Sequence, residues 1–409
     1  MQWLYALLGG AFTRAPDALL AVEGGLSEAS RAVVERAFVD IGGELVDYHT
    51  HVLGTGCGGS GCCVSPLFSQ PLRHPLDALK FGVMMSASGV TDASRADQQY
   101  MERLTALVRA LHAQFPGKWG HHHLLGMTAW RDPATGALSE RNTGIFTPND
   151  YVGRLARDQP ALYWAAPSVH PLDPDAVRQL ECAKRAAVEA GQRQLIVKWL
   201  PNAQGIDPAS SACDPFYAAC KRTGAVLLVH VGRENAVSTP GIDQSLGNPL
   251  RLRRALDAGV RVVAAHCASE GVDEDLDAPA GRPLVSSFSL LLRLFDDARY
   301  ARVLYADISS MTLFKRIGAP LTTMLDRVDL HARLVNGSDY PVVAAAALVQ
   351  TSALVRHGYI TPDERLALNE VYDYNVLLFD YVTKRCVRSP ATGARFAPSV
   401  FMECRALDF

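Results

Sequence analysis

Short apolar runs recur along the chain, and most of them end in a polar or charged side chain. Runs that are apolar on both faces are typical of strands in a parallel sheet, because helices cover such a sheet on both sides. The pattern predicts eight strands, at residues 44–51, 122–128, 161–169, 194–200, 225–231, 260–266, 302–308 and 333–338.

Signals for helix ends lie between the central runs. A capping residue, a proline at the first helical position and a glycine just after the last one are independent marks of a helix. The combination occurs three times, from Asp173-Pro174 to Gly191, from Asp214-Pro215 to Gly224 and from Asn248-Pro249 to Gly259. Strands and helices therefore alternate, which predicts right-handed crossovers between parallel strands.

Eight strands in alternation with helices predict an α/β fold, a closed (β/α)8 TIM barrel whose strand ends converge on one mouth. The alternative is an open doubly wound sheet, which would scatter the same positions along a crevice. The 409 residues exceed the roughly 250 of a typical barrel, so we expect additions to it. These are a helical extension at 1–43, a barrel at 44–385 with an insertion at 52–120, and a tail at 386–409.

Metal-capable side chains stand at the ends of the predicted strands. They are His49, His51, Lys198, His230, His266 and Asp339. His49 and His51 are separated by one residue, and because side chains alternate along a strand, both point the same way. Imidazoles and carboxylates without a thiolate suit zinc, with manganese or iron as alternatives, and such a site keeps an open position for water. We expect a divalent metal centre at the barrel mouth.

The strand-end residues, together with the sequence Gly-Ser-Asp339-Tyr-Pro, resemble the metal-dependent hydrolases of the amidohydrolase superfamily. Residues 198–207 and 226–232 are similar to its amidohydrolase-2 branch. The resemblance extends over about residues 44–380 and implies a TIM barrel with a metal at its mouth. The branch it points to includes hydrolases of amides, esters and lactones together with nonoxidative decarboxylases.

Asp339 is suited both to bind the metal and to accept a proton from water. His266 is either a ligand or a hydrogen-bond donor to the polarised carbonyl of the substrate. We therefore expect a metal-dependent hydrolase that cleaves an amide, ester or lactone bond of a small molecule. The alternatives are a nonoxidative decarboxylase of a small carboxylic acid and a metal-bearing binding protein without turnover.

Lys198 decides whether one or two ions bind. An ammonium group would repel a metal ion, so Lys198 must be neutral, carbamylated, directed at a substrate carboxylate or turned to solvent. The resemblance implies that a carbamylated lysine would bridge two ions, whereas relatives without it hold one. We expect one.

Substrate contacts are predicted at Arg233, Asn202 and His170, which follow three of the strands. An arginine there could hold a carboxylate through two parallel hydrogen bonds. The triplet 121–123, all histidine, is placed at the start of the second strand, where residues serve stability. The glycine-rich segment 54–63 with its three cysteines is expected to be a loop near the mouth.

Composition narrows the class of protein. The formal charge is −2 at pH 7 and the mean hydropathy is +0.04, as in ordinary globular proteins. The chain has no basic stripe for nucleic acid and no apolar run of about 18 residues for a membrane span. Its nine scattered cysteines favour reduced thiols and a cytoplasmic location. The amino end lacks basic residues, which argues against a signal peptide.

The carboxyl region carries a separate signal. Thr361-Pro-Asp-Glu364 predicts a capping box that opens one helix as far as Arg385. Beyond it the tail contains Phe396, Phe401 and Phe409, which could reach a neighbouring subunit. A homodimer is therefore a hypothesis.

Overall fold

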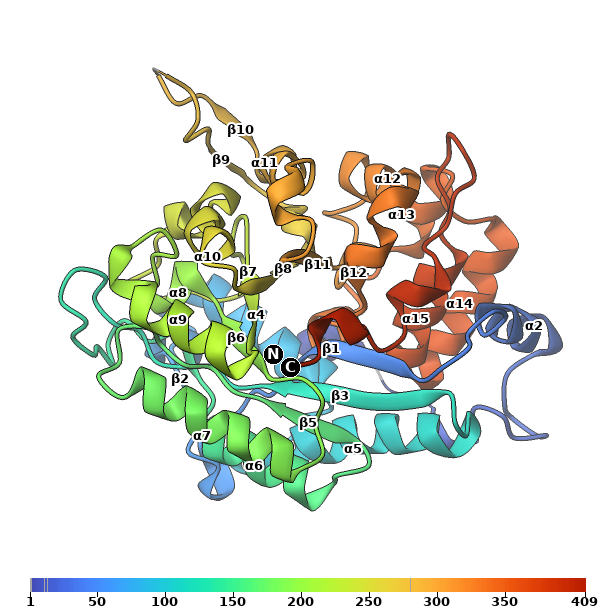
Figure 1. Cartoon of the computed structure of the whole chain (residues 1–409). Coiled ribbons are helices and arrows are strands. Elements are labelled where there is room, and N and C mark those ends of the chain that lie inside the picture. Colours follow the sequence, from blue (N-terminus) through green and yellow to red (C-terminus); the bar gives the residue numbers. More distant parts are fainter. Residues whose placement is uncertain (1, 11, 13, 280) are drawn as a thin grey trace. The chain divides into compact units, whose positions relative to one another are not determined.

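The computed structural model describes residues 2–10, 12, 14–279 and 281–409 (Figure 1). The chain divides into two compact units. The first unit comprises Met1–His51, Leu79–His122 and Ser309–Glu403. The second comprises Val52–Ala78, His123–Ile308 and Cys404–Phe409. The chain passes between the units several times, so each unit is assembled from segments far apart in the sequence.

The first unit is mainly helical and contains the first and last of the predicted strands. Its elements are α1 (Gln2–Gly9), α2 (Glu28–Ala37), β1 (Leu45–His51), α5 (Ala96–Gln114), α12 (Ala319–Asp326), β12 (Leu334–Val335), α13 (Thr351–Arg356), α14 (Pro362–Tyr374) and α15 (Val376–Cys386). Helix α4 (Pro75–Ala87) and strand β3 (Trp119–Leu125) continue from one unit into the other. Helix α5 lies within the insertion predicted at residues 52–120.

Strand β1 is almost fully buried and pairs on both sides within the first unit. On one side the Leu45 N–H donates to the Lys118 carbonyl at 3.0 Å. On the other side the Tyr48 N–H donates to the Asn336 carbonyl at 3.0 Å, and the His51 N–H donates to the Tyr340 carbonyl at 2.9 Å. The segment after β12 therefore runs alongside the end of β1 that carries the two histidines.

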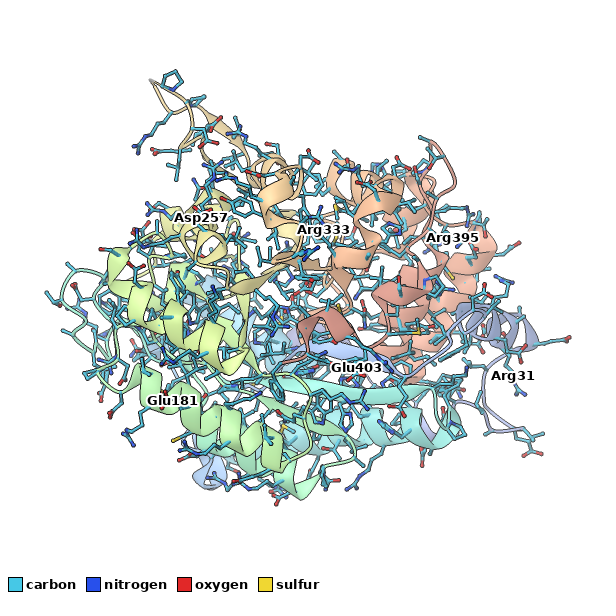
Figure 2. The ribbon with its side chains drawn as sticks, in the orientation of Figure 1. Arg31, Glu181, Asp257, Arg333, Arg395 and Glu403 are labelled. Atoms are coloured by element: carbon cyan, nitrogen blue, oxygen red, sulfur yellow. The ribbon has the colours of Figure 1, made fainter. Side chains whose placement is uncertain are left out.

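The second unit contains the central strands with their helices. Its elements are β2 (Cys63–Val64), α3 (Pro66–Ser69), β4 (Ile145–Phe146), α6 (Asn149–Asp158), β5 (Tyr163–Ala166), α7 (Ala176–Glu189), β6 (Ile196–Trp199), α8 (Pro201–Gln204), α9 (Asp214–Thr223), β7 (Val226–His230), α10 (Arg253–Asp257), β8 (Arg261–Ala265), β9 (Val272–Glu274), β10 (Leu284–Ser286), α11 (Ser287–Phe295) and β11 (Leu304–Asp307). Charged side chains such as Glu181 on α7 and Asp257 on α10 are exposed to solvent (Figure 2).

Strands β6, β7, β8 and β11 lie side by side and are parallel. Lys198 on β6 is opposite Leu228 on β7, and His230 on β7 is opposite Ala265 on β8. Helices α9, α10 and α11 follow β6, β7 and β8 in the chain, and nearly every residue of these strands is buried, as their apolar sequences predict.

A strand is present at each of the eight predicted positions, as β1, β3, β5, β6, β7, β8, β11 and β12. The α/β class and the strand–helix alternation of a (β/α)8 barrel are therefore confirmed. Within neither unit do the strands of the described residues form a closed ring, so ring closure stays a prediction.

The predicted helix ends at Gly191, Gly224 and Gly259 are confirmed, but the first of these helices, α7, begins at Ala176 and not at Pro174. Helix α9 begins at Asp214, and Gly224 ends it with a left-handed φ of 72°. After Asn248 the chain first forms a 3-10 turn, Pro249–Leu252, which leads into α10. The Asn248 side chain caps that turn by accepting the Leu250 N–H at 3.0 Å. None of the helices in the described residues is long and apolar enough to cross a membrane.

Two further expected boundaries are wrong. Strand β3 begins at Trp119, so the histidine triplet lies within the strand rather than at its start. The helix predicted from Thr361 to Arg385 is two helices, because Asn375 leaves the helical conformation with φ −150° and caps α15. The capping box of Thr361 and Glu364 at the start of α14 is confirmed.

The tail folds back onto its own chain. Phe396 and Phe401 are buried within the first unit, where the Val46 N–H donates to the Phe401 carbonyl at 3.0 Å. In the second unit the Phe409 N–H donates to the Arg193 carbonyl at 3.1 Å. Two of the three aromatic residues thus cannot reach a neighbouring subunit, and the homodimer stays a hypothesis without this support.

The cap at Asn375 yields a test of how the first unit is held together. Its Oδ1 accepts the Leu377 and Leu378 N–H groups at 3.1 and 3.2 Å, and its Nδ2 donates to the buried Leu107 carbonyl at 3.0 Å. We expect Asn375→Ala to lower the free energy of unfolding by about 2 kcal/mol or more. The exposed cap variant Thr361→Ala should cost only about 1 kcal/mol. Urea denaturation of both variants measures the difference, and equal losses would contradict the assigned role of Asn375.

Candidate metal centre

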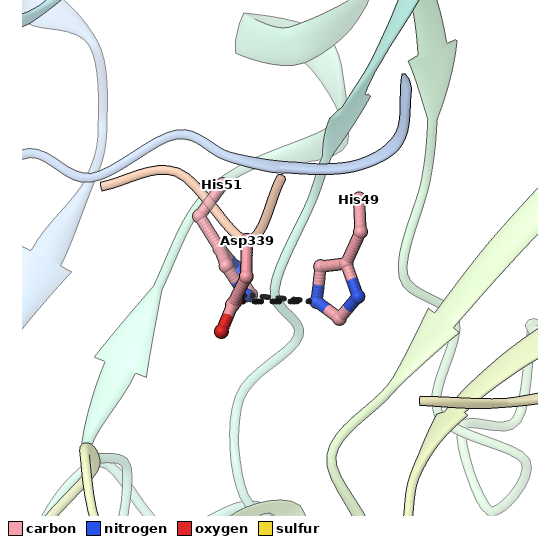
Figure 3. A group of neighbouring side chains, drawn as sticks. All are labelled: His49, His51 and Asp339. Atoms are coloured by element: carbon pink, nitrogen blue, oxygen red, sulfur yellow. Dashed lines mark hydrogen bonds and ion pairs between the residues drawn. The ribbon is translucent and has the colours of Figure 1, made fainter. Parts of the chain in front are cut away.

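Three of the predicted ligands come together in the first unit (Figure 3). The Nε2 atoms of His49 and His51 are 3.2 Å apart. Oδ1 of Asp339 lies 3.6 Å from Nε2 of His49 and 3.3 Å from Nε2 of His51. His49 and Asp339 are buried, whereas the His51 side chain is 18% exposed. The cluster is thus enclosed on the His49 side and accessible from the His51 side.

Backbone pairing between β1 and the turn at residues 336–339 brings the ligands together. The Asp339 N–H donates to the His49 carbonyl at 2.7 Å, next to the pairing of His51 with Tyr340. Gly337 permits this approach, because a Cβ at that position would lie 2.5 Å from the Cβ of His49. A side chain at residue 337 would therefore push His49 and the turn apart.

Asp339 has a strained backbone that its neighbours support. Its φ is 61°, a left-handed value that is uncommon for residues other than glycine. The Ser310 hydroxyl donates to Oδ2 of Asp339 at 2.6 Å, and the backbone of Ser310 is also left-handed, with φ 57°. Oδ1 is thereby left facing the two imidazoles. Strain of this kind is concentrated at functional sites, where the surrounding structure maintains it.

A polar layer lies behind the ligands. One oxygen of Asp47 accepts the N–H groups of His49 at 2.9 Å and Ser338 at 3.0 Å, and the other lies 3.3 Å from Nδ1 of His122. Burial raises the pKa of the Asp47 carboxyl. The hydrogen bond and the charge of His122, together with hydrogen bonds from Ser338 and from the His49 backbone, lower this pKa to about 2. His122 also accepts the Trp119 indole N–H at 3.0 Å. Its role is thus structural, as the sequence predicts for the triplet.

The donor set fits a divalent metal ion. Two ligand atoms that each bind one ion at about 2.1 Å in tetrahedral geometry lie about 3.4 Å apart, close to the three distances in the cluster. Binding through Nε2 requires the proton on Nδ1, and Nδ1 of His49 lies 3.4 Å from the Ser309 hydroxyl, which can accept it. The two imidazoles and the carboxylate would hold such an ion and leave further positions open.

The other predicted ligands belong to the second unit. His230 ends β7, His266 follows β8, and their ring centroids are 5.3 Å apart. Lys198 lies on the neighbouring strand β6 and is buried. His266 also has a left-handed φ, 55°. These residues gather at the carboxyl end of the parallel strands, and their participation in one centre with His49 stays a prediction.

Two acidic side chains accompany the histidines of the second unit. Oε2 of Glu234 lies 3.5 Å from Nε2 of His230, and the same side chain accepts the Val237 N–H at 2.8 Å through Oε1. Oδ1 of Asp307 accepts the His266 N–H at 2.9 Å. Asp307 ends strand β11 and was missed in the sequence, although the strand-end rule that selected the other residues applies to it.

The predicted substrate contacts lie in the second unit. The Asn202 amide donates to the Gly232 carbonyl at 3.1 Å and to the Gln244 side chain at 3.0 Å, so it holds the loop after β7. Both nitrogens of His170 are engaged, because Nδ1 accepts the Leu172 N–H at 3.2 Å and Nε2 donates to the Gln204 carbonyl at 3.0 Å. Arg233 is exposed. Their contact with substrate stays a prediction.

No protein-family model matches the sequence, and no curated protein matches it. Solved structures do match. A TIM-barrel protein of Bordetella bronchiseptica is 16% identical over 80% of this chain and 95% of its own, with a TM-score of 0.46. A candidate 2-pyrone-4,6-dicarboxylic acid hydrolase of Pseudomonas putida is 15% identical over 73% of this chain and 83% of its own, with a TM-score of 0.38.

A third structure is a variant of the 5-carboxyvanillate decarboxylase of Novosphingobium aromaticivorans, with bound manganese and a nitrobenzoic acid. It is 12% identical over 84% of this chain and 95% of its own, with a TM-score of 0.41. Other matching structures are named as amidohydrolases.

The cluster predicts that each histidine is needed for metal binding. We expect His49→Ala and His51→Ala to lose the bound ion, because either change leaves only two of the three clustered ligands. Atomic emission analysis of the purified proteins measures metal per chain, and His357→Ala, which changes an exposed histidine of the same unit, is the control. Full metal content in His49→Ala would rule out the assignment.

The buried position of His170 predicts that the free energy of unfolding falls in acid. Burial lowers the pKa of His170 to about 4, although its hydrogen bond to the Gln204 carbonyl raises it. The unfolded chain, with a histidine pKa of about 6.5, takes up the proton first as the pH falls. The contribution of His170 is therefore complete above pH 6.5 and is lost as the pH falls towards 4, by up to roughly 3 kcal/mol.

Urea midpoints between pH 7 and pH 4 measure this loss. In His170→Asn an amide oxygen can still accept the Leu172 N–H but does not titrate, so the midpoint should vary less with pH. The same slope in the variant and the unchanged chain would show that another group causes the acid sensitivity.

Proposed function

We propose that the chain is a metal-dependent hydrolase of the amidohydrolase type that cleaves an amide, ester or lactone bond of a small molecule. The observation that carries the proposal is the cluster of His49, His51 and Asp339, two imidazoles and a carboxylate with their ligand atoms facing one another. No thiolate belongs to the cluster, and a site of three protein ligands leaves room for water and substrate.

A bound zinc, manganese or iron ion would supply Lewis acidity, which acidifies water and polarises a carbonyl. The chain supplies the ligands and the base. Oδ1 of Asp339 faces the imidazoles, and Ser310 holds Oδ2, so the carboxylate is fixed in one orientation. In this arrangement Asp339 accepts the proton of the attacking water and returns it to the leaving group.

We propose a single ion, held by the cluster of the first unit. His230 and His266 would complete the site as a further ligand and as a donor to the substrate carbonyl, and Lys198 would contact the substrate. Arg233, Asn202 and His170 would line the substrate side. A second ion would require carbamylation of Lys198, which elemental analysis of protein prepared with added bicarbonate would detect as two metal equivalents per chain.

Asp339→Asn tests the proposed base. The amide can still bind metal through its oxygen, but it cannot accept a proton, so we expect partial metal retention and a loss of turnover of at least about 100-fold. Asp329→Asn removes an exposed carboxylate of the same unit and should leave turnover unchanged. Turnover of Asp339→Asn within a few-fold of the unchanged chain would eliminate Asp339 as the base.

The same assay distinguishes hydrolysis from decarboxylation. The metal-loaded chain is supplied with lactones, esters, amides and aromatic carboxylic acids, while acid release and carbon dioxide release are measured separately. Release of carbon dioxide from a carboxylic acid, without hydrolysis of the other compounds, would show that the chain is a decarboxylase and not a hydrolase. Metal binding without turnover of any compound would favour a binding protein.

A further inference from the structure

Helix α15 carries a buried ion pair behind the turn that bears Asp339. Asp380 and Lys384 lie one helical turn apart, and the lysine Nζ donates to Oδ2 of Asp380 at 2.6 Å. Asp380 is 2% exposed and Lys384 is 0% exposed. Two charges taken out of water in this way require further polar partners, since their mutual attraction alone seldom compensates for desolvation.

The further polar partners of Lys384 lie in the turn that bears Asp339. Nζ donates to the Gly337 carbonyl at 2.7 Å and lies 3.4 Å from the side-chain oxygen of Asn336. Together with Asp380 these contacts use the three donors of the ammonium group. Gly337 is two residues before Asp339 and is the residue whose missing side chain makes room for His49. The position of the Gly337 carbonyl therefore affects both ligand-bearing segments.

A small cavity with both polar and apolar lining residues adjoins the pair. Its volume of about 10 Å³ has room for about one water molecule. Asp47, Ser338 and Asp380 are among its lining residues. Oδ1 of Asp380 is buried and has no hydrogen-bond partner among the described residues. The turn is thus backed by a polar layer, in which one charged helix residue contacts the backbone directly.

We propose that Lys384 is a positioning residue of the metal centre, which fixes the Gly337 carbonyl and through it the placement of Asp339 against His49. This inference rests on the proposed metal-dependent function. The pair is a poor means of stabilising a core, because apolar residues of similar volume commonly serve as well or better. Its specific effect is to hold one backbone carbonyl at a fixed place beside the ligands.

Removing both charges separates positioning from stability. Lys384→Met alone leaves Asp380 buried without its partner, so the urea midpoint should fall sharply. The double variant Lys384→Met/Asp380→Leu carries no charge at either position of the pair, so its midpoint should recover. Its affinity for Zn²⁺ should stay weakened by about 10- to 100-fold, the usual range for loss of a group that orients a metal ligand.

Two further measurements isolate the effect. Asp380→Asn also leaves a buried charge without its partner, so its urea midpoint should fall as well. Its amide oxygen can still accept from Nζ and the bond from Lys384 to Gly337 is kept, so the folded variant should bind Zn²⁺ within about twofold of the unchanged chain. The absorption spectrum of the Co²⁺-loaded protein reports ligand geometry, and it should change in the double variant but not in Asp380→Asn. Arg388→Met is the matched control, because it breaks a half-buried pair with Glu364 near the end of the same helix, away from the turn.

The outcomes are distinct. Unchanged Zn²⁺ affinity and Co²⁺ spectrum in the double variant would overturn the positioning role while leaving the metal centre intact. A loss of affinity in Asp380→Asn as large as in Lys384→Met would overturn it too, since the charge of the pair would then matter and not the bond to Gly337. Should the double variant not fold, the comparison of Asp380→Asn with Lys384→Met decides. An unchanged chain that binds neither Zn²⁺ nor Co²⁺ would contradict the proposed function itself.

Discussion

The carboxylate of Asp47 ties together the two backbone segments that carry the clustered ligands. One of its oxygens accepts N–H groups from His49 on β1 and from Ser338 on the turn, which are far apart in the sequence. Hydrogen bonds to a charged acceptor are about twice as strong as those between neutral groups. The carboxylate therefore acts as a buried clamp, and the placement of Asp339 against the imidazoles depends on it.

This clamp explains how the site tolerates unfavourable features. The left-handed backbone at Asp339 and at Ser310 costs on the order of 1–3 kcal/mol at each position. The bond between these two residues and the pairing of Asp339 with His49 hold the chain in that conformation. Because the ligands are fixed by several independent contacts, a metal ion would meet a preformed site and would not have to order it.

The strands could be predicted because burial on both faces leaves a continuous apolar run, and a polar residue at its end is then conspicuous. That reasoning found His49, His51 and Asp339, and it would have found Asp307. The boundary at Asn375 was missed, because an asparagine within a helical pattern is usually interpreted as an exposed position of the helix. Its role as a cap depends on the backbone conformation, which the sequence pattern does not show. Ser309 and Ser310 were missed too, because serines after a strand are common.

Lys384 shows the limit of pattern reasoning most clearly. An aspartate four residues before a lysine on a helix normally indicates a solvent-exposed pair that contributes a few tenths of a kcal/mol. Here nearly all of α15 is buried, so its surroundings and not its sequence decide what the pair does. A lysine on a helix that is buried in this way needs a hydrogen-bond acceptor for each N–H of its ammonium group. The Gly337 carbonyl is such an acceptor, and the turn that presents it to Lys384 also carries Asp339.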